Sequence, residues 1–479
     1  MKRIKRVVIV VPNYILRDEY GAPSSPPIGP AMVAATLRLD GYEVELLDAD
    51  AENLNLEQTA DRIFAFGPEA VGISCNYITK HNPTLRLARI LKQRQSDLLV
   101  FAGGNHAAAW YDGLLEAGSP IDVVLTGEGE AETPALLKAM SETGSPEGVP
   151  GACIFTGGMA TVMSAGGRSS LPMVTPGATK LLAPRGHIDE LDSLPLAAYD
   201  MLQMDKYMRF ELVTSRGCPY TCSLCASTEI VGTKVRLRSP QSVVQEVQHL
   251  RSTYGERFLW ISDDTFTAIK KHATSISAAF QELDNPVRWS CFSTVSTLNA
   301  EVLKAMKAGG CEYTSIGVET THPSQSRYVG KKVTDQTVAD AVARCHDAGL
   351  RVYGFIIMGF PGENRETMES RYNLIEKAKF DDVGVNMLIP LPGTMIWNEL
   401  VASKKFDPRE LPLDYLFARV SDEGDSDRSA DLTSTWCDLT ASELLEGVRK
   451  CREIGKAASP NYVPRDMTMP AAEPQQVCA

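Results

Sequence analysis

The chain has 479 residues, which is too long for one compact core and predicts two or three domains. Hydrophobic residues make up 44% of it and charged residues 23%, so most of the chain is expected to fold. The formal net charge of −12 argues against a general binder of nucleic acids or anionic membranes, because phosphate affinity requires a surplus of Lys and Arg.

The N-terminal segment MKRIKRVVIVVPN is basic and then apolar, as a secretion signal would be. Its apolar run is only as long as a strand and ends at Pro12-Asn13, and no small-residue cleavage site follows, so a first β-strand is expected. No apolar run in the chain approaches the roughly 18 residues that are needed to span a bilayer. We therefore expect a cytoplasmic protein with no membrane partner.

Residues 1–140 alternate between apolar, strand-like runs and amphipathic helical stretches. The strand-like runs are RVVIVVP, YEVELLDAD, AVGISC, LLVFAGG and IDVVLTGE. The helical stretches cover residues 29–40, 56–66, 84–95, 106–117 and 129–140. Near-continuous apolar strands between such helices indicate a parallel sheet that is covered on both faces. The segment predicts a doubly wound, flavodoxin-like α/β domain, whose ligands bind at the carboxyl ends of the strands.

Residues 141–209 are expected to form a connector. The stretch GVPGACIFTGGMATVMSAGG predicts a short hairpin punctuated by glycines, and DELDSLPLAAYDML predicts irregular structure around Pro195. No residue of the connector points to chemistry, so we interpret it as a packed linker.

The alternation resumes over residues 210–400. The strand-like runs are ELVTSRG, RFLWISDD, VRWSCFSTVS, CEYTSIGVET, RVYGFIIMGF and DDVGVNMLIP. Helical patterns follow at residues 240–253, 268–282, 298–308, 334–348, 364–379 and 395–403. Six such units predict a partial (β/α)6 barrel or a complete barrel, again with the functional residues at the carboxyl ends of the strands.

Residues 401–479 are expected to form a small, mostly helical C-terminal region. It begins with the acidic run SDEGDSDRSAD, which we interpret as a solvated loop, and continues with the amphipathic helix ASELLEGVRKCREIGKAA. The Pro-rich end that follows is expected to be disordered.

Eleven cysteines in a chain expected in the cytoplasm favour free, metal-bound or catalytic thiols over disulfides. Three of them, Cys218, Cys222 and Cys225, lie in the loop SRGCPYTCSLCAS after the first predicted barrel strand. Their C-x3-C-x2-C spacing does not match a structural zinc site, which takes paired knuckles and four ligands. A zinc ion or a non-metal role is nevertheless the alternative. The other eight are interpreted as small buried hydrophobic residues: Cys75, Cys153, Cys291, Cys311, Cys345, Cys437, Cys451 and Cys478.

This cysteine spacing, on the loop after the first strand of a β/α barrel, resembles the radical S-adenosylmethionine (SAM) superfamily. The resemblance implies that Cys218, Cys222 and Cys225 hold a [4Fe–4S] cluster whose fourth iron chelates SAM. An electron from a donor such as flavodoxin or ferredoxin would then produce a 5′-deoxyadenosyl radical, which abstracts hydrogen from an unactivated C–H bond. The superfamily usually has an aromatic residue just before the third cysteine, where this chain has Leu224. Tyr220 supplies an aromatic residue earlier in the loop and is a candidate catalytic residue.

Further residues match the superfamily at the carboxyl ends of the predicted barrel strands. The resemblance implies that Asp263 and Asp264 meet the ammonium group of SAM, with helix capping as the alternative. Glu319 is a candidate catalytic and cofactor-binding residue, because a carboxylate in a barrel mouth needs a partner such as the ammonium or ribose of the cofactor. The remaining candidates are Ser293 and Thr294 for the ribose and Gly359 and Gly362 for the adenine.

The doubly wound domain before the barrel is similar to the subgroup with an N-terminal cobalamin-binding domain. The matching stretches are PPIGPAMVAATLRLDGYEVELLDAD, VGISCN, FAGGNHA and TGEGEAE. Glycines at the strand ends let the backbone approach a bulky ligand, and the candidates are Gly103, Gly104, Gly127 and Gly129.

The Asp-x-His-x-x-Gly signature of enzymes that ligate cobalt through His is absent. His81 and His106 lack that context, so we interpret them as surface or packing residues. The resemblance then leaves the lower face of the cobalt to the loop after the third strand, which carries Asn76 and Tyr77.

The two resemblances together predict a radical SAM enzyme in which methylcobalamin donates its methyl group to an unactivated carbon of a small molecule, in natural-product biosynthesis. The alternative is a cobalamin-free diol dehydratase for a sugar or an aminoglycoside, in which Tyr220 acts on the intermediate. A tRNA methylthiotransferase is disfavoured, because only Cys75 and Cys153 precede the loop and the tail is acidic. A cobalamin or iron–sulfur sensor would leave Glu319 and Asp263 without a purpose.

Overall fold

The computed structural model describes residues 3–13, 25–156, 179–405, 407–408, 411, 413 and 428–459. The chain divides into two compact units. Unit 1 comprises residues 1–204, 225–232 and 390–419, and unit 2 comprises residues 205–224, 233–389 and 420–479. The predicted α/β class is confirmed for both units.

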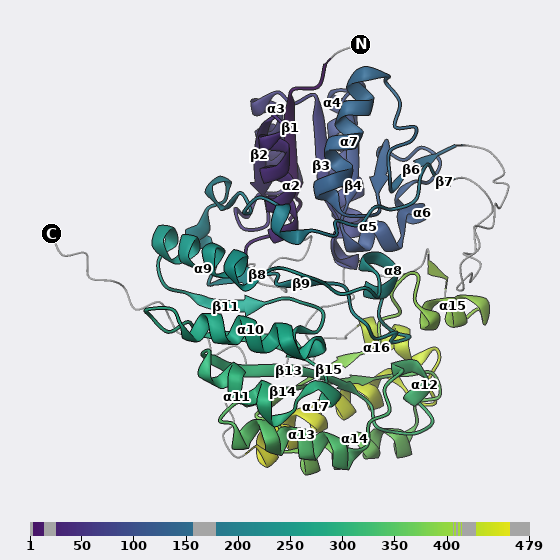
Figure 1. Ribbon diagram of the computed structural model, residues 1–479. Helices are drawn as coiled ribbons and strands as arrows, with labels where there is room; N and C mark the ends of the chain where they lie inside the picture. Colours follow the sequence, from purple (N-terminus) through teal and green to yellow (C-terminus); the bar gives the residue numbers. More distant parts are fainter. Residues whose placement is uncertain are drawn as a thin grey trace. The chain divides into compact units, whose positions relative to one another are not determined.

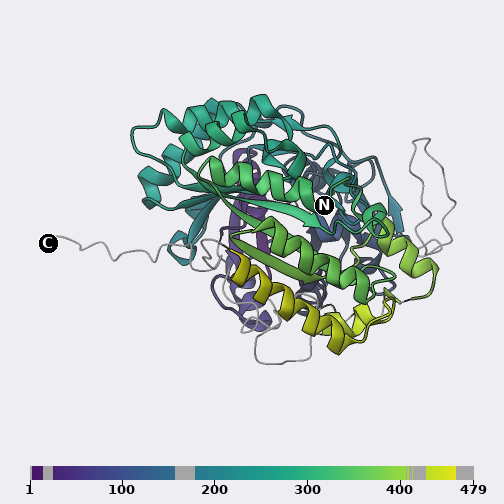
Figure 2. The ribbon, with the colours of Figure 1, turned by 90° about the horizontal axis from the view of Figure 1, so that it is seen from below.

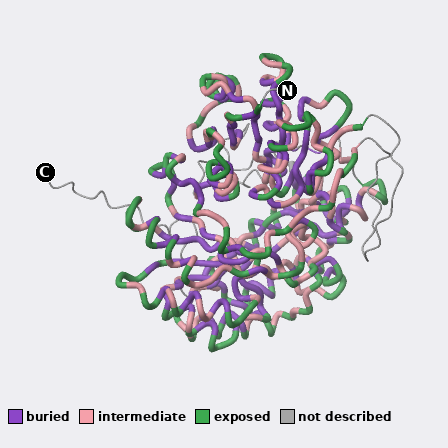
Figure 3. Tube along the Cα trace, turned by 45° about the horizontal axis from the view of Figure 1, so that its top comes forward, coloured by how far each residue is buried: buried purple, intermediate pink, exposed green. Residues whose placement is uncertain are grey.

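Unit 1 contains a seven-stranded sheet with the order β2-β1-β3-β4-β5-β6-β7. The first five strands are parallel, and β1 to β5 run over Arg6–Val11, Glu43–Asp48, Ala70–Ser74, Leu99–Gly103 and Val123–Leu125. Their apolar residues are largely buried, as expected for strands that are covered on both faces (Figure 3). The order 2-1-3-4-5 is flavodoxin-like, and such sheets bind ligands at the carboxyl ends of the strands beside the switch point between β1 and β3.

Helices cover both faces of this sheet. α2 (Ile28–Leu39) packs beside α7 (Gly129–Glu142) on one face, and α3 (Leu56–Phe66) packs beside α4 (His81–Arg94) on the other (Figure 1). The predicted helix over residues 106–117 is instead two short helices, α5 (Asn105–Ala109) and α6 (Tyr111–Leu114). They are separated by Trp110, whose φ of −136° is not helical.

The connector adds strands to the sheet of unit 1. β6 (Ala152–Phe155) pairs antiparallel with β5, and β7 (Thr179–Leu181) pairs antiparallel with β6. The predicted hairpin is confirmed only in its first strand, because residues 157–178 lie outside the described residues. Two short helices from later in the chain also belong to unit 1, namely α8 (Ser227–Val231) and α15 (Met395–Ala402).

Unit 2 contains a six-stranded, entirely parallel sheet in the order β15-β14-β13-β12-β11-β8. The six strands follow one another in space as they do in the chain, so the predicted partial barrel is confirmed. Their bounds are Arg209–Leu212, Phe258–Ile261, Trp289–Ser293, Cys311–Glu319, Arg351–Met358 and Asp382–Met387, from β8 to β15. A two-stranded ribbon of β9 (Ser215–Arg216) and β10 (Arg236–Leu237) lies in the segment between β8 and β11.

The helices of unit 2 pack side by side along the sheet (Figure 2). They are α9 (Pro240–Tyr254), α10 (Lys270–Gln281), α11 (Ala300–Ala308), α13 (Asp335–Asp347), α14 (Arg365–Ala378) and α17 (Ala441–Ala458). The helix predicted for the sixth barrel unit is α15, which belongs to unit 1, and α17 packs against β15 and α14 instead.

Unit 2 also contains two shorter α-helices, α12 (Ser326–Val329) and α16 (Arg428–Ser434). Most of the predicted acidic loop and the whole Pro-rich tail, residues 421–427 and 460–479, lie outside the described residues. Across the described ranges, no helix combines the length and the apolar character that crossing a membrane requires.

Candidate functional site

The three cysteines of the loop differ from most others in the chain by being accessible. Cys218, Cys222 and Cys225 are half-buried, whereas burial raises the pKa of Cys75 and Cys153 to about 12. A metal ligand must be deprotonated and reachable, so the loop cysteines fit that role and the buried ones do not. The prediction of buried cysteines is confirmed for six of the eight: Cys75, Cys153, Cys291, Cys311, Cys345 and Cys451. Cys437 is half-buried, and Cys478 lies outside the described residues.

The cysteine ligands of an iron–sulfur cluster are arranged differently from the ligands of a single metal ion. Within the described ranges, no three His, Cys, Asp or Glu side chains are grouped as the ligands of one metal ion. A [4Fe–4S] cluster binds each thiolate to a different iron atom, so its cysteines lie farther apart than the ligands of a single ion. The three loop cysteines are half-buried, and their role as ligands of such a cluster stays a prediction.

Asp263 anchors the strand that leads into the cysteine loop. Its buried carboxylate accepts hydrogen bonds from Thr214 N and Oγ1, both at 2.6 Å, and from Ser215 Oγ at 2.7 Å. Burial raises the pKa of Asp263, and these hydrogen bonds oppose that rise. Both oxygens are thus occupied by protein donors, while the neighbouring Asp264 is exposed. The structure gives Asp263 a positioning contact, and the contact of either residue with SAM stays a prediction.

The start of the cysteine loop lies beside the turn after β11. Cys218 Sγ is 3.7 Å from Thr265 Oγ1. Thr265 was not among the residues predicted from the sequence, although it directly follows the candidates Asp263 and Asp264. Tyr220 is half-buried in the same loop.

The middle of the cysteine loop packs on the segment after β13. Ser223 Oγ donates to the carbonyl oxygen of Arg327 at 3.1 Å. A Cβ atom added to Gly330 would lie 3.2 Å from the carbonyl oxygen of Thr221 and 3.5 Å from Cys222 Cα. The loop that holds the first two cysteines is therefore in contact with the turn that precedes Lys331.

Glu319 ends β13 in an unusual backbone conformation. Its φ is +65°, and the pairing with β14 shifts register between Gly317 and Glu319. A left-handed backbone costs a non-glycine residue roughly 1–3 kcal/mol, so the surrounding structure must sustain it. Burial raises the pKa of Glu319 to about 7, while the charge of Lys331 opposes this rise. Lys331 Nζ lies 4.0 Å from Glu319 Oε1 and donates to the carbonyl oxygen of Gly317 at 2.7 Å.

The ribose candidates lie at the end of β12. Ser293 Oγ accepts a hydrogen bond from Thr314 Oγ1 at 2.8 Å, and Cys291 Sγ lies 3.7 Å from the same hydroxyl. Ser293 and Thr294 are both buried. The hydroxyl of Ser293 is therefore engaged between β12 and β13, and a contact of either residue with ribose stays a prediction.

The MGFPGE turn after β14 is held by a buried carboxylate and an indole. Glu363 Oε2 accepts from Gly359 N at 2.9 Å, and Trp436 Nε1 donates to the Gly359 carbonyl oxygen at 2.8 Å. Gly359 has a φ of +92°, and a Cβ atom there would lie 2.0 Å from Thr433 Cγ2. Packing alone therefore requires this glycine, whereas a Cβ atom on Gly362 would meet open space.

In unit 1, the ends of β3 and β4 bring several candidates together. Asn76 Oδ1 accepts a hydrogen bond from Asn105 N at 3.2 Å, and a Cβ atom on Gly104 would lie 2.3 Å from that same oxygen. The φ of Gly104 is +104°, which also favours glycine. Tyr77 is 62% exposed beside this edge.

The remaining glycines of this edge differ in how much space a side chain would have. A Cβ atom on Gly127 would lie 2.1 Å from Glu132 Oε1, and one on Gly129 would lie 2.8 Å from Val33 Cγ2. A side chain at Gly129 would press on Val33, and one at Gly127 would require the Glu132 carboxylate to shift, so both glycines also serve packing within the unit. Gly103 has more room, since the nearest atom to its Cβ position lies 3.7 Å away. A surface without side chains at Gly103 fits the approach of a large ligand such as cobalamin.

His81 and His106 in unit 1 are packing residues, which is one of the two roles, surface or packing, that the sequence predicted. His81 Nδ1 and His106 Nε2 lie 3.0 Å apart, and the ring of His81 stacks on Trp110 with 4.8 Å between the ring centroids. Burial lowers the pKa of His81 to about 4 and that of His106 to about 3. Both are therefore neutral at pH 7.

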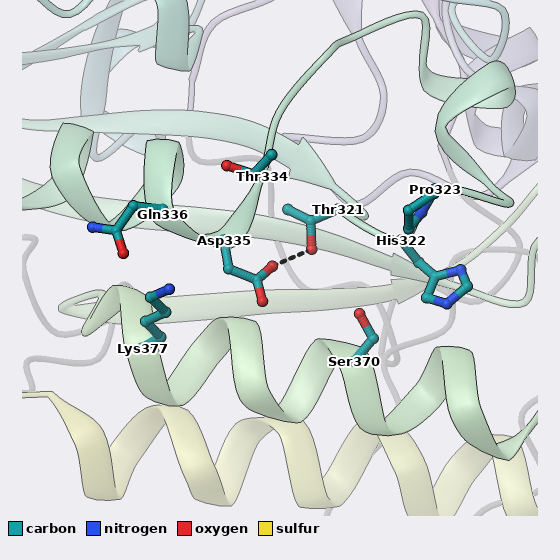
Figure 4. A pocket seen from close by; sticks show the side chains of 8 residues that line it. All are labelled: Thr321, His322, Pro323, Thr334, Asp335, Gln336, Ser370 and Lys377. Carbon is teal, nitrogen blue, oxygen red and sulfur yellow. Dashed lines mark hydrogen bonds between the residues drawn. The ribbon is translucent and has the colours of Figure 1, made fainter.

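A polar pocket of about 350 Å³ lies in unit 2 among the segment after β13, the start of α13 and α14 (Figure 4). Thr321 Oγ1 donates to Asp335 across it. Its lining contains none of the residues predicted for cofactor binding: Thr321, His322, Pro323, Thr334, Asp335, Gln336, Ser370 and Lys377.

Two known families match two separate parts of the chain. Residues 22–137 match the B12 binding domain, and residues 212–375 match the Radical SAM superfamily. The first match contains the strand ends with Asn76 and Gly103, and the second contains the cysteine loop and Glu319.

Relatives match most of the chain. An uncharacterized methyltransferase of Pyrococcus horikoshii is 31% identical over 408 residues, which cover 84% of each chain. The cytidylyl-2-hydroxyethylphosphonate methyltransferase of Streptomyces wedmorensis is 25% identical over 454 residues, covering 85% of this chain and 84% of its own. The structure of the radical SAM methyltransferase TsrM from Kitasatospora setae, with cobalamin and a [4Fe–4S] cluster bound, matches with a TM-score of 0.67 at 18% identity, covering 100% of this chain and 93% of that one.

Proposed function

Because the chain belongs to the radical SAM superfamily, in the group with an N-terminal B12-binding domain, we propose that it transfers a methyl group to an unactivated carbon of a small molecule. Its cofactors are a [4Fe–4S] cluster, SAM and cobalamin. The observation that carries the proposal is the presence of both cofactor-binding domains in one chain, which relatives named as methyltransferases match over most of their length.

The cysteine loop and Glu319 supply the contacts with the cluster and with SAM in this proposal. Cys218, Cys222 and Cys225 would hold the cluster. When bound, the cluster supplies the electron that cleaves SAM and produces a 5′-deoxyadenosyl radical. Glu319 and Lys331 carry opposite charges 4.0 Å apart. SAM carries an ammonium and a carboxylate on its amino-acid portion, so Glu319 suits the former and Lys331 the latter.

The edge of unit 1 supplies the cobalamin contacts. Gly103 and Gly104 would let the corrin approach the ends of β4, while Asn76 and Tyr77 would face the cobalt from the loop after β3. Neither His81 nor His106 is proposed as a cobalt ligand, because the two side chains are buried against each other. A weakly held lower face favours release of a methyl group to a substrate radical.

The proposed acceptor is a small molecule of natural-product biosynthesis, and the proposed electron donor is flavodoxin or ferredoxin. A net charge of −12 makes a nucleic-acid acceptor unfavourable. The relative from Streptomyces wedmorensis is named for methylation of a cytidylyl phosphonate, which is a small molecule.

The test is an anaerobic reconstitution of the full chain with iron, sulfide and SAM, with and without cobalamin, in which dithionite or reduced flavodoxin supplies the electrons. S-adenosylhomocysteine is expected to form only when reduced cobalamin is present, and 5′-deoxyadenosine is expected to depend on the cluster. A Cys222→Ala control should retain the corrinoid absorption bands and lose 5′-deoxyadenosine. Turnover without cobalamin that gives 5′-deoxyadenosine and no S-adenosylhomocysteine would overturn methyl transfer and favour the dehydratase.

A further inference from the structure

Arg185, in the segment after β7, contacts three separate elements of unit 1. Its Nε donates to Thr126 Oγ1 at 3.1 Å, its Nη1 to the carbonyl oxygen of Glu229 at 2.7 Å, and its Nη2 to the carbonyl oxygen of Ala108 at 3.3 Å. Thr126 follows β5, Ala108 lies in α5 and Glu229 lies in α8. One guanidinium group thus joins a strand end and two short helices.

The carbonyl groups that Arg185 binds lack partners within their own helices. α5 and α8 each have five residues, and the last four carbonyl oxygens of a helix have no intrahelical donor. A cation at this end is also favoured by the helix dipole. The rigid fork of arginine serves both carbonyl oxygens at once, which the single ammonium group of a lysine does not do as well.

The backbone around Arg185 is itself fixed to unit 1. Leu182 N donates to the carbonyl oxygen of Ala152 at 2.8 Å, and Ile188 N donates to Glu128 Oε2 at 2.6 Å. Both bonds join this part of the connector to elements of the sheet domain. The backbone on both sides of Arg185 is therefore fixed by hydrogen bonds to unit 1.

α8 is directly linked to the third cysteine of the loop. It begins at Ser227, whose backbone N–H donates to Cys225 Sγ at 3.4 Å. Cys225, Ser227 and Glu229 all belong to the segment 225–232 of unit 1. Hydrogen bonds to the sulfur ligands of an iron–sulfur cluster are among the factors that set its reduction potential.

We infer that Arg185 is a positioning residue for the cluster: it holds α8 on unit 1, so that Ser227 N stays in place on Cys225 Sγ. The inference rests on the proposed role of Cys225 as a cluster ligand. The same guanidinium holds α5, which follows the predicted cobalamin edge at Gly103 and Gly104. The connector, interpreted from the sequence as a packed linker without chemistry, thus positions residues next to both cofactors.

The experiment compares Arg185→Met, which keeps the length of the side chain but removes its donors, with Arg185→Lys and with the wild type. Arg38→Met is the matched control, because Arg38 forms an exposed ion pair with Asp200 in the same unit. Amide hydrogen exchange is measured on the cluster-free chain, and the midpoint potential is measured after reconstitution. In Arg185→Met, exchange in residues 105–109 and 227–231 is expected to be about tenfold faster, and the midpoint potential is expected to shift.

Arg185→Lys is expected to fall between Arg185→Met and the wild type, and Arg38→Met is expected to match the wild type. Equal acceleration of exchange throughout unit 1 would mean a general loss of stability and would overturn the inference. An unchanged midpoint potential in Arg185→Met would also overturn the inference. Neither measurement uses a methyl acceptor, so an error in the proposed reaction leaves both intact. A Cys225→Ala chain that retained a full cluster would refute the ligand assignment and the inference with it.

Discussion

Lys331 Nζ lies 4.0 Å from Glu319 Oε1, and the same ammonium group donates to the backbone carbonyl of Gly317 on the same strand. The pair lies where β13 shifts register and where Glu319 takes up a φ of +65°. A strained backbone conformation and a raised pKa at the same residue are typical of functional sites. The surrounding structure there stabilises a conformation that is unfavourable for the residue by itself. Gly330, the residue before Lys331, packs on the cysteine loop, since a Cβ atom there would lie 3.5 Å from Cys222 Cα.

The Lys331 charge should set the pH dependence of the reaction. Glu319 is proposed to act as a carboxylate, and its pKa is raised to about 7, so 5′-deoxyadenosine formation should rise as the pH increases through this value. Lys331 lowers the pKa of Glu319, so Lys331→Met should move the acidic limb of the rate profile to higher pH. The rate is measured as kcat/KM, at SAM concentrations well below saturation, because this ratio reports the pKa of the free enzyme. Lys332→Met removes the exposed neighbouring lysine and should leave the limb in place. A limb that did not move in Lys331→Met would contradict the assignment.

Glu319 should also make the stability of the chain depend on pH. Its pKa rises from 4.5 in the unfolded chain to about 7 in the fold, so both states are protonated below pH 4.5. Between pH 4.5 and 7 the unfolded state ionises first, so this residue's contribution to stability is lost as the pH rises through that window. With 13% of its side chain exposed, Glu319→Gln should gain about 1–3 kcal/mol over the wild type by pH 8, measured by denaturant unfolding. Glu453→Gln, on the exposed face of α17, is the control. An equal gain in stability in this variant would contradict the explanation by the raised pKa of Glu319.

Each cysteine of the loop should be needed for the cluster. Cys218→Ala, Cys222→Ala and Cys225→Ala should lose the visible absorption of the cluster and the formation of 5′-deoxyadenosine, because three thiolates are the minimum that leaves one iron for SAM. Cys437→Ala is the control matched in burial, and it should keep a full complement of iron and sulfide. Iron and sulfide are quantified per chain. An intact cluster in any of the three loop variants would refute that cysteine as a ligand.

The MGFPGE turn depends on a buried ion pair that was not predicted from the sequence. Arg371 Nη1 lies 2.7 Å from Glu363 Oε1, and both side chains are at most 1% exposed. Arg371→Met should lower the free energy of unfolding by about 3–5 kcal/mol, because it leaves Glu363 buried without its cation. Arg365→Met, in an exposed pair with Glu443, should cost less than about 1 kcal/mol. Denaturant unfolding compares the two, and similar losses would show that the buried pair is not specifically required.

Most strands and helices could be predicted because their signal is local. The pattern of residues 441–458 predicted the helix α17 to the residue, and the apolar runs predicted all six strands of unit 2. Which sheet a helix covers is not a local property. The helix over residues 395–403 has the expected pattern, yet α15 belongs to unit 1, where Trp397 contacts Trp110.

The same limit applies to the candidate site. The cysteine spacing and Glu319 could be found from the sequence, because spacing and the end of a strand are visible there. Lys331 could not, because its place beside Glu319 depends on a register shift and on a left-handed turn at Gly330, which leave no periodic signal. Arg185 was missed for a related reason, since its three partners are distant in the chain.

The proposed cobalamin edge can be tested by adding a single methyl group. A Cβ atom on Gly103 would have 3.7 Å to its nearest neighbour, so Gly103→Ala should change the free energy of unfolding by less than about 1 kcal/mol. If the corrin packs on this backbone, the same methyl group should weaken cobalamin binding roughly tenfold, the equivalent of about 1.4 kcal/mol. Retained corrinoid absorption per chain and a binding titration measure this effect.

Gly104→Ala is the contrasting variant, because its Cβ atom would lie 2.3 Å from Asn76 Oδ1 and its φ of +104° disfavours alanine. It should lose stability as well as cobalamin. Gly118→Ala is a second comparison: that glycine also has a positive φ, but its Cβ atom would meet open space, so strain is tested there without a clash. Unchanged cobalamin affinity in a stable Gly103→Ala chain would place the corrin away from the end of β4 and leave Asn76 and Tyr77 without the proposed role.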